Sequence, residues 1–317
     1  MPSAIDESHL HAVAEEAVRE GRRAASEGEV ASYIPALGDA DPESFALVVS
    51  GTGDVEEHAF GDADVPFPIQ SLSKVFALTL AMQKAEAAEG VATELWGRVG
   101  REPSGDPFNS LVQLEKESGV PRNPMINPGA LIVHDVLLAH CDDAEGSLLD
   151  LLSELAGERL EVDERVAASE LEHQHRNRAM AHLMASFGNL HHPVEEVLDT
   201  YVRACAISMT ARQVARAIRF LANDGVVPGT ENRILPSRLV RRVNAVMLTC
   251  GTYDAAGEFA FRVGLPCKSG VAGVIAAVVP GRMGVCVWSP PLEASGNSLG
   301  GRIALHHLAT ELELSVF

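Results

Sequence analysis

Lysine is rare in this chain, and two of the four lysines stand in patterns that could do chemistry. Of the 25 basic residues, four are lysine and 21 are arginine. Lys74 closes an S-x-x-K sequence that Ser71 opens, and Lys268 opens a K-S-G sequence nearly two hundred residues later. A buried lysine can lose its proton, whereas arginine in a protein stays charged. Lysines kept at these two places therefore indicate acid–base chemistry rather than solubility.

Ser71 and Lys74 have the spacing of a nucleophile and its base. The residues from 71 to 87 predict a helix, so side chains three apart share a face, and Ser71 falls in its first turn, where free N–H groups favour an anion. A desolvated lysine can take the serine proton. Each motif alone is typical of a helix cap or a turn lysine. Together, S-x-x-K and a distant K-[ST]-G are typical of penicillin-interacting serine acyltransferases and hydrolases, and the strand expected over 263–271 could then line the site.

The three tyrosines could belong to the same site. The chain contains only Tyr33, Tyr201 and Tyr253. A phenol can relay a proton and can hydrogen-bond a carboxylate. Taken singly, each is more typical of a packed aromatic residue with a satisfied hydroxyl.

Composition excludes several classes of function. The 317 residues carry a formal charge of −19, so no basic stripe can neutralise nucleic acid or bind an anionic membrane surface. We expect no signal peptide and no apolar run long enough to span a bilayer. The five cysteines and the histidines, such as His173 and His175, lack disulfide or zinc spacing. We therefore expect no metal, reduced thiols, structural or surface histidines, and a cytoplasmic location.

The elements expected around these residues suggest a sheet built from both ends of the chain. We expect helices over 8–29, 71–87, 236–248 and 297–311, a run of helices over 129–224, two strands within 44–60, and strands over 258–263, 273–279 and 283–288. This order predicts an α/β fold of the α+β kind. The prediction is one domain over 1–317, with a sheet sub-domain over 1–70 plus 235–317 and an inserted helical sub-domain over 71–234.

From about residue 28 to its C-terminus, the chain resembles the serine-dependent glutaminases, which have a β-lactamase-like fold. The resemblance is carried by segments 33–37, 69–76, 102–105, 123–127, 169–170 with 176–177, 250–254, 264–273, 288–292 and 296–298. It implies a β-lactamase/penicillin-binding-protein-like architecture, in which helices flank an antiparallel sheet. It also implies hydrolysis of L-glutamine to L-glutamate and ammonia, without a cofactor, by a homo-oligomer that is a dimer or a tetramer.

The resemblance assigns a role to each site residue. It implies that Ser71 attacks the side-chain amide, that Lys74 accepts the serine proton, and that Tyr253, with Tyr201 beside it, assists proton transfer to ammonia. The main-chain N–H groups of Ser71 and Val271 are implied to hold the oxyanion. The residues implied to bind or line the amino-acid head-group site are Tyr33, Gln70, Asn127, Glu170 and Asn177.

Two other functions remain open at this point. A β-lactamase or D,D-peptidase shares both motifs, but such enzymes act outside the cytoplasm, and neither an export signal nor an S-D-N sequence is recognisable. A non-catalytic glutamine-binding protein would have no need of a nucleophile, which weighs against it. Glutamine turnover distinguishes these alternatives from a glutaminase.

Overall fold

A five-stranded antiparallel sheet joins the two ends of the chain in the computed structural model, which describes residues 6–53, 55–105 and 107–317. Residues 1–5 of the predicted sheet sub-domain lie outside the described part. The strand order is β3-β2-β9-β8-β7, and every neighbouring pair is antiparallel. The strands are β2 (Ala46–Gly51), β3 (His58–Gly61), β7 (Cys267–Gly270), β8 (Val274–Val279) and β9 (Met283–Trp288).

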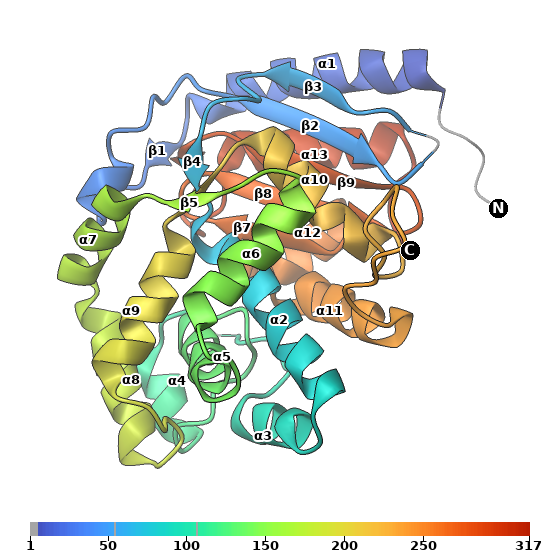
Figure 1. Cartoon of the computed structure of the whole chain (residues 1–317). Helices are drawn as coiled ribbons and strands as arrows, with labels where there is room; N and C mark the ends of the chain where they lie inside the picture. Colours follow the sequence, from blue (N-terminus) through green and yellow to red (C-terminus); the bar gives the residue numbers. More distant parts are fainter. Residues whose placement is uncertain (1–5, 54, 106) are drawn as a thin grey trace.

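Helices cover both faces of this sheet, so its central strands are apolar on both sides (Figure 1). Alternate residues of β2 enter different cores. Leu47 and Val49 pack with α1 (Glu7–Ala25) and α13 (Leu299–Glu311). Ala46 and Val48 belong to the larger core that includes α10 (Ala211–Ala222). The alternation follows from the two-residue period of a strand.

Most of the chain between β3 and β7 is helical and lies on the α10 side of the sheet (Figure 1), whereas the segment just before β7 contributes Phe259 and Val263 to the core shared with α1 and α13. Its central helices, α2 (Ser73–Ala87) and α5 (Asn127–His140), are buried along most of their length. The surrounding helices are α3 (Val91–Arg98), α4 (Leu111–Lys116), α6 (Ala144–Ala156), α7 (Glu164–His173), α8 (His175–Ser186), α9 (Val194–Cys205) and α11 (Ser237–Cys250). A helix that is apolar all round needs such neighbours.

Two small sheets and three short 3₁₀ helices complete the fold. One sheet pairs β1 (Glu29–Val30) with β10 (Pro291–Leu292), and the other has the order β4 (Phe67–Pro68), β6 (Ile207–Met209), β5 (Glu161–Val162). The 3₁₀ helices are η1 (Pro35–Leu37), η2 (Gln70–Leu72) and η3 (Tyr253–Ala255). β5 and β6 fall inside the segment for which only helices were predicted.

The predicted mixed α/β architecture with an antiparallel sheet is confirmed, but one strand prediction is wrong. Residues 258–263 belong to helix α12 (Ala256–Arg262) and its C-cap, not to a strand. Phe259 and Val263, four residues apart, are buried, whereas Phe261 between them is 86% exposed. A short apolar run does not distinguish these two periods, because strands and helices both bury part of it. The first helix is also shorter than predicted, ending at Ala25 before β1.

The division of the chain into two sub-domains stays a prediction.

Among the described residues, none of the helices combines the length and the apolar character needed to cross a bilayer.

Candidate active site

A cavity of about 230 Å³ opens beside Ser71, and we call it the serine cavity. Eight of the residues predicted for the site line it: Tyr33, Gln70, Ser71, Asn127, Glu170, Asn177, Tyr201 and Val271. They come from the segment before η1, from η2, α5, α7, α8 and α9, and from the turn after β7. Segments more than two hundred residues apart in sequence therefore meet at one hollow.

Ser71 lies at the junction of two helical segments. It is in η2, directly before α2, and only 7% of its surface is exposed. The preceding Gln70 has a φ of +50°, a left-handed conformation that non-glycine residues rarely adopt. Such strain clusters at functional sites, where the surrounding structure holds it in place. The turn thus aims Ser71 into the cavity at the N-terminal end of a buried helix.

Lys74, on the helix that follows Ser71, is also buried. It is 1% exposed, and its Nζ donates a hydrogen bond of 2.7 Å to Asn127 Oδ1. Burial lowers the pKa of the Lys74 amine to about 8, against a smaller opposite effect from Cys205 and Glu170. Desolvation disfavours the charged form of an amine. A substantial neutral fraction of Lys74 is therefore present slightly above neutral pH, as a base requires.

Asn127 connects Lys74 to the far wall of the cavity. Its Nδ2 donates to Asn177 Oδ1 at 2.9 Å, and the Tyr201 hydroxyl donates to its Oδ1 at 3.4 Å. Oδ1 thus accepts from both Lys74 and Tyr201. The network orients the Asn127 amide, since its oxygen faces the donors and its nitrogen faces Asn177.

Glu170 places a carboxylate where a cation would be stabilised. It lies on α7, is 5% exposed, and accepts a hydrogen bond of 3.0 Å from Gln70 Nε2. Burial raises the pKa of Glu170 to about 7, although the Gln70 hydrogen bond and the charge of Lys74 act in the opposite direction. An ammonium group that enters the cavity would strongly stabilise the ionised form of this buried carboxylate, which has one neutral hydrogen-bond donor.

Tyr253 lies outside the lining of the cavity but contacts Ser71. Burial raises the pKa of Tyr253 to about 12, and a side-chain hydrogen bond with Ser71 partly offsets this effect. Tyr253 also has a φ of +60°, and its hydroxyl donates to the Ser269 carbonyl at 3.3 Å. Lys74, likewise not a lining residue, reaches the cavity through Asn127. All the predicted site residues are therefore brought together around Ser71.

Lys268 is buried behind Tyr253 instead of lining the serine cavity. Its Nζ lies 4.4 Å from the centroid of the Tyr253 ring and donates to the Ser269 carbonyl at 2.6 Å. Burial lowers the pKa of Lys268 well below its usual value. Within the segment 263–271, only Cys267–Gly270 forms a strand, and Val271 lies in the following turn. Lys268 thus supports Tyr253 and does not face a ligand in the serine cavity.

Sequence reasoning missed part of the lining. The residues not predicted there are Ile34, Phe108, Asn109, His173, Gln174 and Arg176. Phe108 packs on Tyr253 with ring centroids 4.8 Å apart. It lies in an irregular segment without periodicity, so no pattern signals it. His173, expected at the surface or in a structural role, lies on α7 with Glu170, and one turn of this helix separates the two residues. Their three-residue spacing was the available signal.

Comparison with known proteins gives consistent matches over nearly the whole chain. A family model described as "Glutaminase" matches residues 28–317. A protein named "Glutaminase" from Paraburkholderia phytofirmans is 53% identical over 292 residues, covering 92% of this chain and 93% of its own.

Solved structures of glutaminases have the same fold as this chain. The probable glutaminase YbaS superposes with a TM-score of 0.90 at 33% identity and 99% coverage of both chains. The Bacillus subtilis glutaminase YbgJ, in a covalent complex formed by reaction with 6-diazo-5-oxo-L-norleucine, has a TM-score of 0.84 at 33% identity, covering 98% of this chain and 99% of its own. These matches confirm the predicted β-lactamase-like fold.

Proposed function

The chain belongs to the glutaminase family, and from this premise we propose that it hydrolyses L-glutamine to L-glutamate and ammonia through a glutamyl ester on Ser71. The observation that carries the proposal is the buried Lys74 amine, which lies three residues after Ser71 and is hydrogen-bonded to Asn127 in the wall of a cavity that the buried Glu170 carboxylate also lines. The Lys74 amine can accept a proton, and the Glu170 carboxylate can bind the ammonium group of an amino acid.

Acylation begins with the serine hydroxyl. Neutral Lys74 takes the proton of Ser71 as Oγ attacks the side-chain amide carbon of glutamine. The developing oxyanion is held by the main-chain N–H groups of Ser71 and Val271, both of which border the cavity. Preorganised donors of this kind lower the barrier because they need no reorganisation as charge develops.

The leaving group must depart as ammonia, which requires a proton on the amide nitrogen. Tyr253, hydrogen-bonded to Ser71, delivers that proton and is reprotonated from the Lys74 ammonium, with Tyr201 in the same network. The C–N bond then breaks, leaving a glutamyl ester. Water attacks this ester, its proton returns through the same groups, and L-glutamate and free Ser71 are formed. The covalent complex of the related YbgJ supports a covalent route.

Recognition of the head group follows from the remaining lining. Glu170 pairs with the substrate ammonium, displacing or sharing the Gln70 donor. The amide of Asn177 and the hydroxyl of Tyr33, both in the lining of the cavity, donate to the substrate carboxylate. Asn127 positions both Asn177 and Lys74 through its hydrogen bonds to them. The chemistry uses side chains and backbone alone.

Ammonia release from glutamine by the purified protein tests the proposal. Ser71→Ala should abolish turnover and remove the covalent adduct with 6-diazo-5-oxo-L-norleucine seen by mass spectrometry. Ser73→Ala is the matched control, because the Ser73 hydroxyl faces Cys205 Sγ rather than the cavity. Lys74→Arg keeps the charge but cannot accept a proton, so it should be nearly as inactive. An adduct on another residue, or activity in Ser71→Ala, would contradict the mechanism.

We also propose that the protein is a cytoplasmic homo-oligomer. All five cysteines are free, and four of them are buried, which suits a reducing compartment. Cell fractionation and light scattering after size exclusion test location and assembly, and a monomer at micromolar concentration would contradict the second statement.

A further inference from the structure

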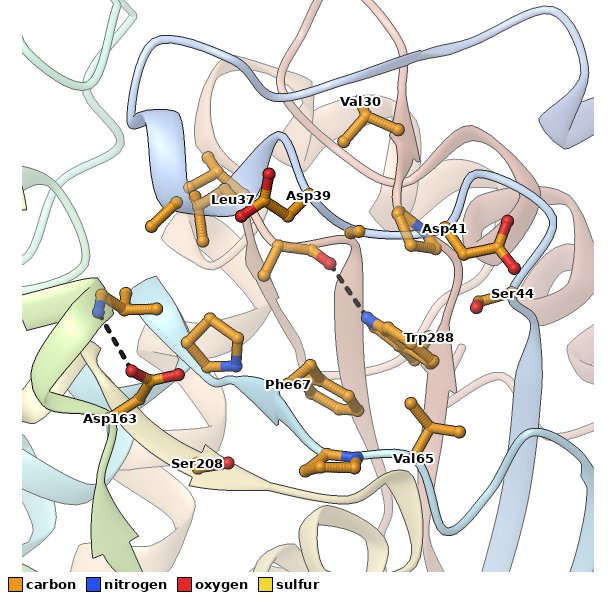
Figure 2. A pocket seen from close by; sticks show the side chains of 18 of the residues that line it. Val30, Leu37, Asp39, Asp41, Ser44, Val65, Phe67, Asp163, Ser208 and Trp288 are labelled. Carbon is orange, nitrogen blue, oxygen red and sulfur yellow. Dashed lines mark hydrogen bonds between the residues drawn. The ribbon is translucent and has the colours of Figure 1, made fainter. Parts of the chain in front are cut away.

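A second cavity, of about 320 Å³, lies next to the serine cavity and is the larger of the two. We call it the tryptophan cavity, because Trp288 forms its inner wall (Figure 2). Trp288 and Phe67 stack there with ring centroids 4.8 Å apart and an interplanar angle of 13°. Both rings are almost fully buried. The size and the aromatic wall are those of small-molecule sites, yet the proposed reaction uses none of these side chains.

The rim of the tryptophan cavity is acidic. Figure 2 shows Asp39, Asp41 and Asp163 around it, and Arg165 is the one basic side chain in the described lining. Arg165 pairs with Asp39. Asp163 uses one carboxylate oxygen to cap α7, accepting from the N–H groups of Arg165 and Val166. Excess negative charge over an apolar floor favours a ligand with a cationic head and an apolar body.

The two cavities share a wall at the turn after β7. Val271 borders both cavities, and Ala272 beside it borders the tryptophan cavity. The indole Nε1 of Trp288 donates to the Ala272 carbonyl at 3.0 Å, the bond drawn in Figure 2. A ligand that moves Trp288 therefore acts, through one hydrogen bond, on the Ala272–Gly273 peptide. This peptide lies two peptide units beyond the Val271 N–H that is proposed to hold the oxyanion.

Two further segments run from one cavity to the other. Phe67 lines the tryptophan cavity, and Ser71 lines the serine cavity four residues later. On α7, Val166 lines the first, and Glu170 lines the second, one helical turn along. Rigid elements that border both sites are the physical means by which occupancy of one changes the other.

We propose that the tryptophan cavity binds a small organic amine with an aromatic or branched apolar body, and that its occupancy changes turnover at the serine cavity. The binding step rests on the cavity alone, whereas the coupling rests on the proposed function. Coupling of this kind typically changes affinity by roughly 5- to 150-fold. Linkage then requires that L-glutamate in the serine cavity changes the affinity for the amine by the same factor as the amine changes the affinity for L-glutamate.

The test uses 2-phenylethylamine as the probe and calorimetry on the full chain. A ligand of this size is expected to bind with a Kd on the order of 1 mM. Its neutral and anionic counterparts, 2-phenylethanol and 3-phenylpropionate, are expected to bind at least about fivefold more weakly. Equal binding of the alcohol, or no saturable binding of the amine, would overturn the proposed ligand class.

Substitutions at the rim locate the probe. Val65 borders the tryptophan cavity and is 41% exposed, so Val65→Trp can fill the cavity without entering the core, and it should weaken binding at least about tenfold. Val316→Trp, at a residue 45% exposed in the C-terminal segment, is the matched control and should bind as the unmodified chain does. Asp41→Asn removes one carboxylate. It should weaken binding of the amine roughly two- to fivefold and leave binding of the alcohol unchanged. Unchanged binding in Val65→Trp would overturn the site.

Competition separates the two cavities, because an amine could also approach Glu170. With the substrate site filled by L-glutamate, the amine must still bind, with an affinity that reaches a plateau as glutamate rises. Displacement without a plateau would place the probe in the serine cavity and overturn the inference. Saturating amine must change kcat/KM for glutamine at least about fivefold, and unchanged kinetics would refute the coupling. Probe binding by a protein without glutaminase activity would refute only the proposed function.

Discussion

Replacing Lys74 with methionine should inactivate the protein and make it more stable at neutral pH. Methionine has a similar length and an apolar, adaptable side chain, and the lysine it replaces is 1% exposed inside the core. The proposed base is lost, so ammonia release should fall to background. The gain in stability arises because an ammonium group no longer has to be held away from water.

The magnitude follows from the titration of Lys74. Burial moves the pKa of its amine from 10.5 to about 8, and each pKa unit corresponds to about 1.4 kcal/mol. The folded state at pH 7 is thus destabilised by about 3 kcal/mol relative to a neutral side chain. The substitution also removes the donor to Asn127 Oδ1, which costs about 1 kcal/mol, because the Tyr201 hydroxyl remains as a second donor. The net expectation is a free energy of unfolding about 2 kcal/mol higher.

The pH dependence of this gain identifies its cause. Between pH 8 and 10.5 the unfolded chain holds a proton on Lys74 that the folded protein has lost, so the unmodified protein gains stability as pH rises through this window. The advantage of Lys74→Met is therefore full below pH 8 and should shrink to about zero by pH 10. Urea denaturation at pH 7, 8.5 and 10, followed by circular dichroism, measures it.

Lys84→Met is the matched control, because Lys84 lies on the same helix but is only half-buried. It should change the free energy of unfolding by less than about 1 kcal/mol. A Lys74→Met protein that is less stable at pH 7, or whose advantage is the same at pH 7 and pH 10, would refute the argument that burial neutralises this amine.

Two further predictions concern the same site, and a third concerns helix α5, which carries Asn127. At saturating glutamine, kcat should rise about tenfold between pH 7 and pH 9, as the neutral fraction of Lys74 grows through its pKa of about 8; a flat initial-rate profile would exclude it as the base. Glu170→Gln should raise KM for glutamine about 100-fold, with less effect on kcat, because it removes the charge opposite the substrate ammonium. Since burial raises the pKa of Glu170 to about 7, KM of the unmodified enzyme should also rise below pH 7, and steady-state kinetics that show neither change would contradict its role. Gly129→Ala, whose added Cβ would lie 1.9 Å from the Asn123 carbonyl oxygen, should lower stability by at least about 2 kcal/mol in thermal melts, whereas Gly257→Ala, with no atom within 4 Å, should not.

Local sequence predicted the elements that repeat a clear period. The helix from residue 71 carries Ser71 and Lys74 as expected, although its first turn is the 3₁₀ helix η2. The strands over 273–279 and 283–288 are present as β8 and β9. The strand predicted over 258–263 is wrong, because the four apolar residues of this segment fit both periods equally well.

The residues of the serine cavity were predicted from the family resemblance and not from periodicity. Glu170 and Asn177 taken alone are typical of a solvated helix, and only the packing of α7 and α8 against the rest of the site buries them. Phe108 carries no signal in its own segment. Its position against Tyr253 depends on two loops 145 residues apart, and contacts of that range are not encoded in local propensity.

The amino-acid sequence by itself determined that the proposed nucleophile, Ser71, and the proposed base, Lys74, lie together, because a three-residue spacing on a helix places two side chains on one face whatever the rest of the chain does. Only the tertiary structure decided their environment. It buries the Lys74 amine and so lowers its pKa to about 8, it brings Glu170 and Ser71 to the same cavity, and it forms the tryptophan cavity from segments far apart in sequence. Desolvation and enclosure depend on what packs around a residue, and that packing exists only in the folded chain.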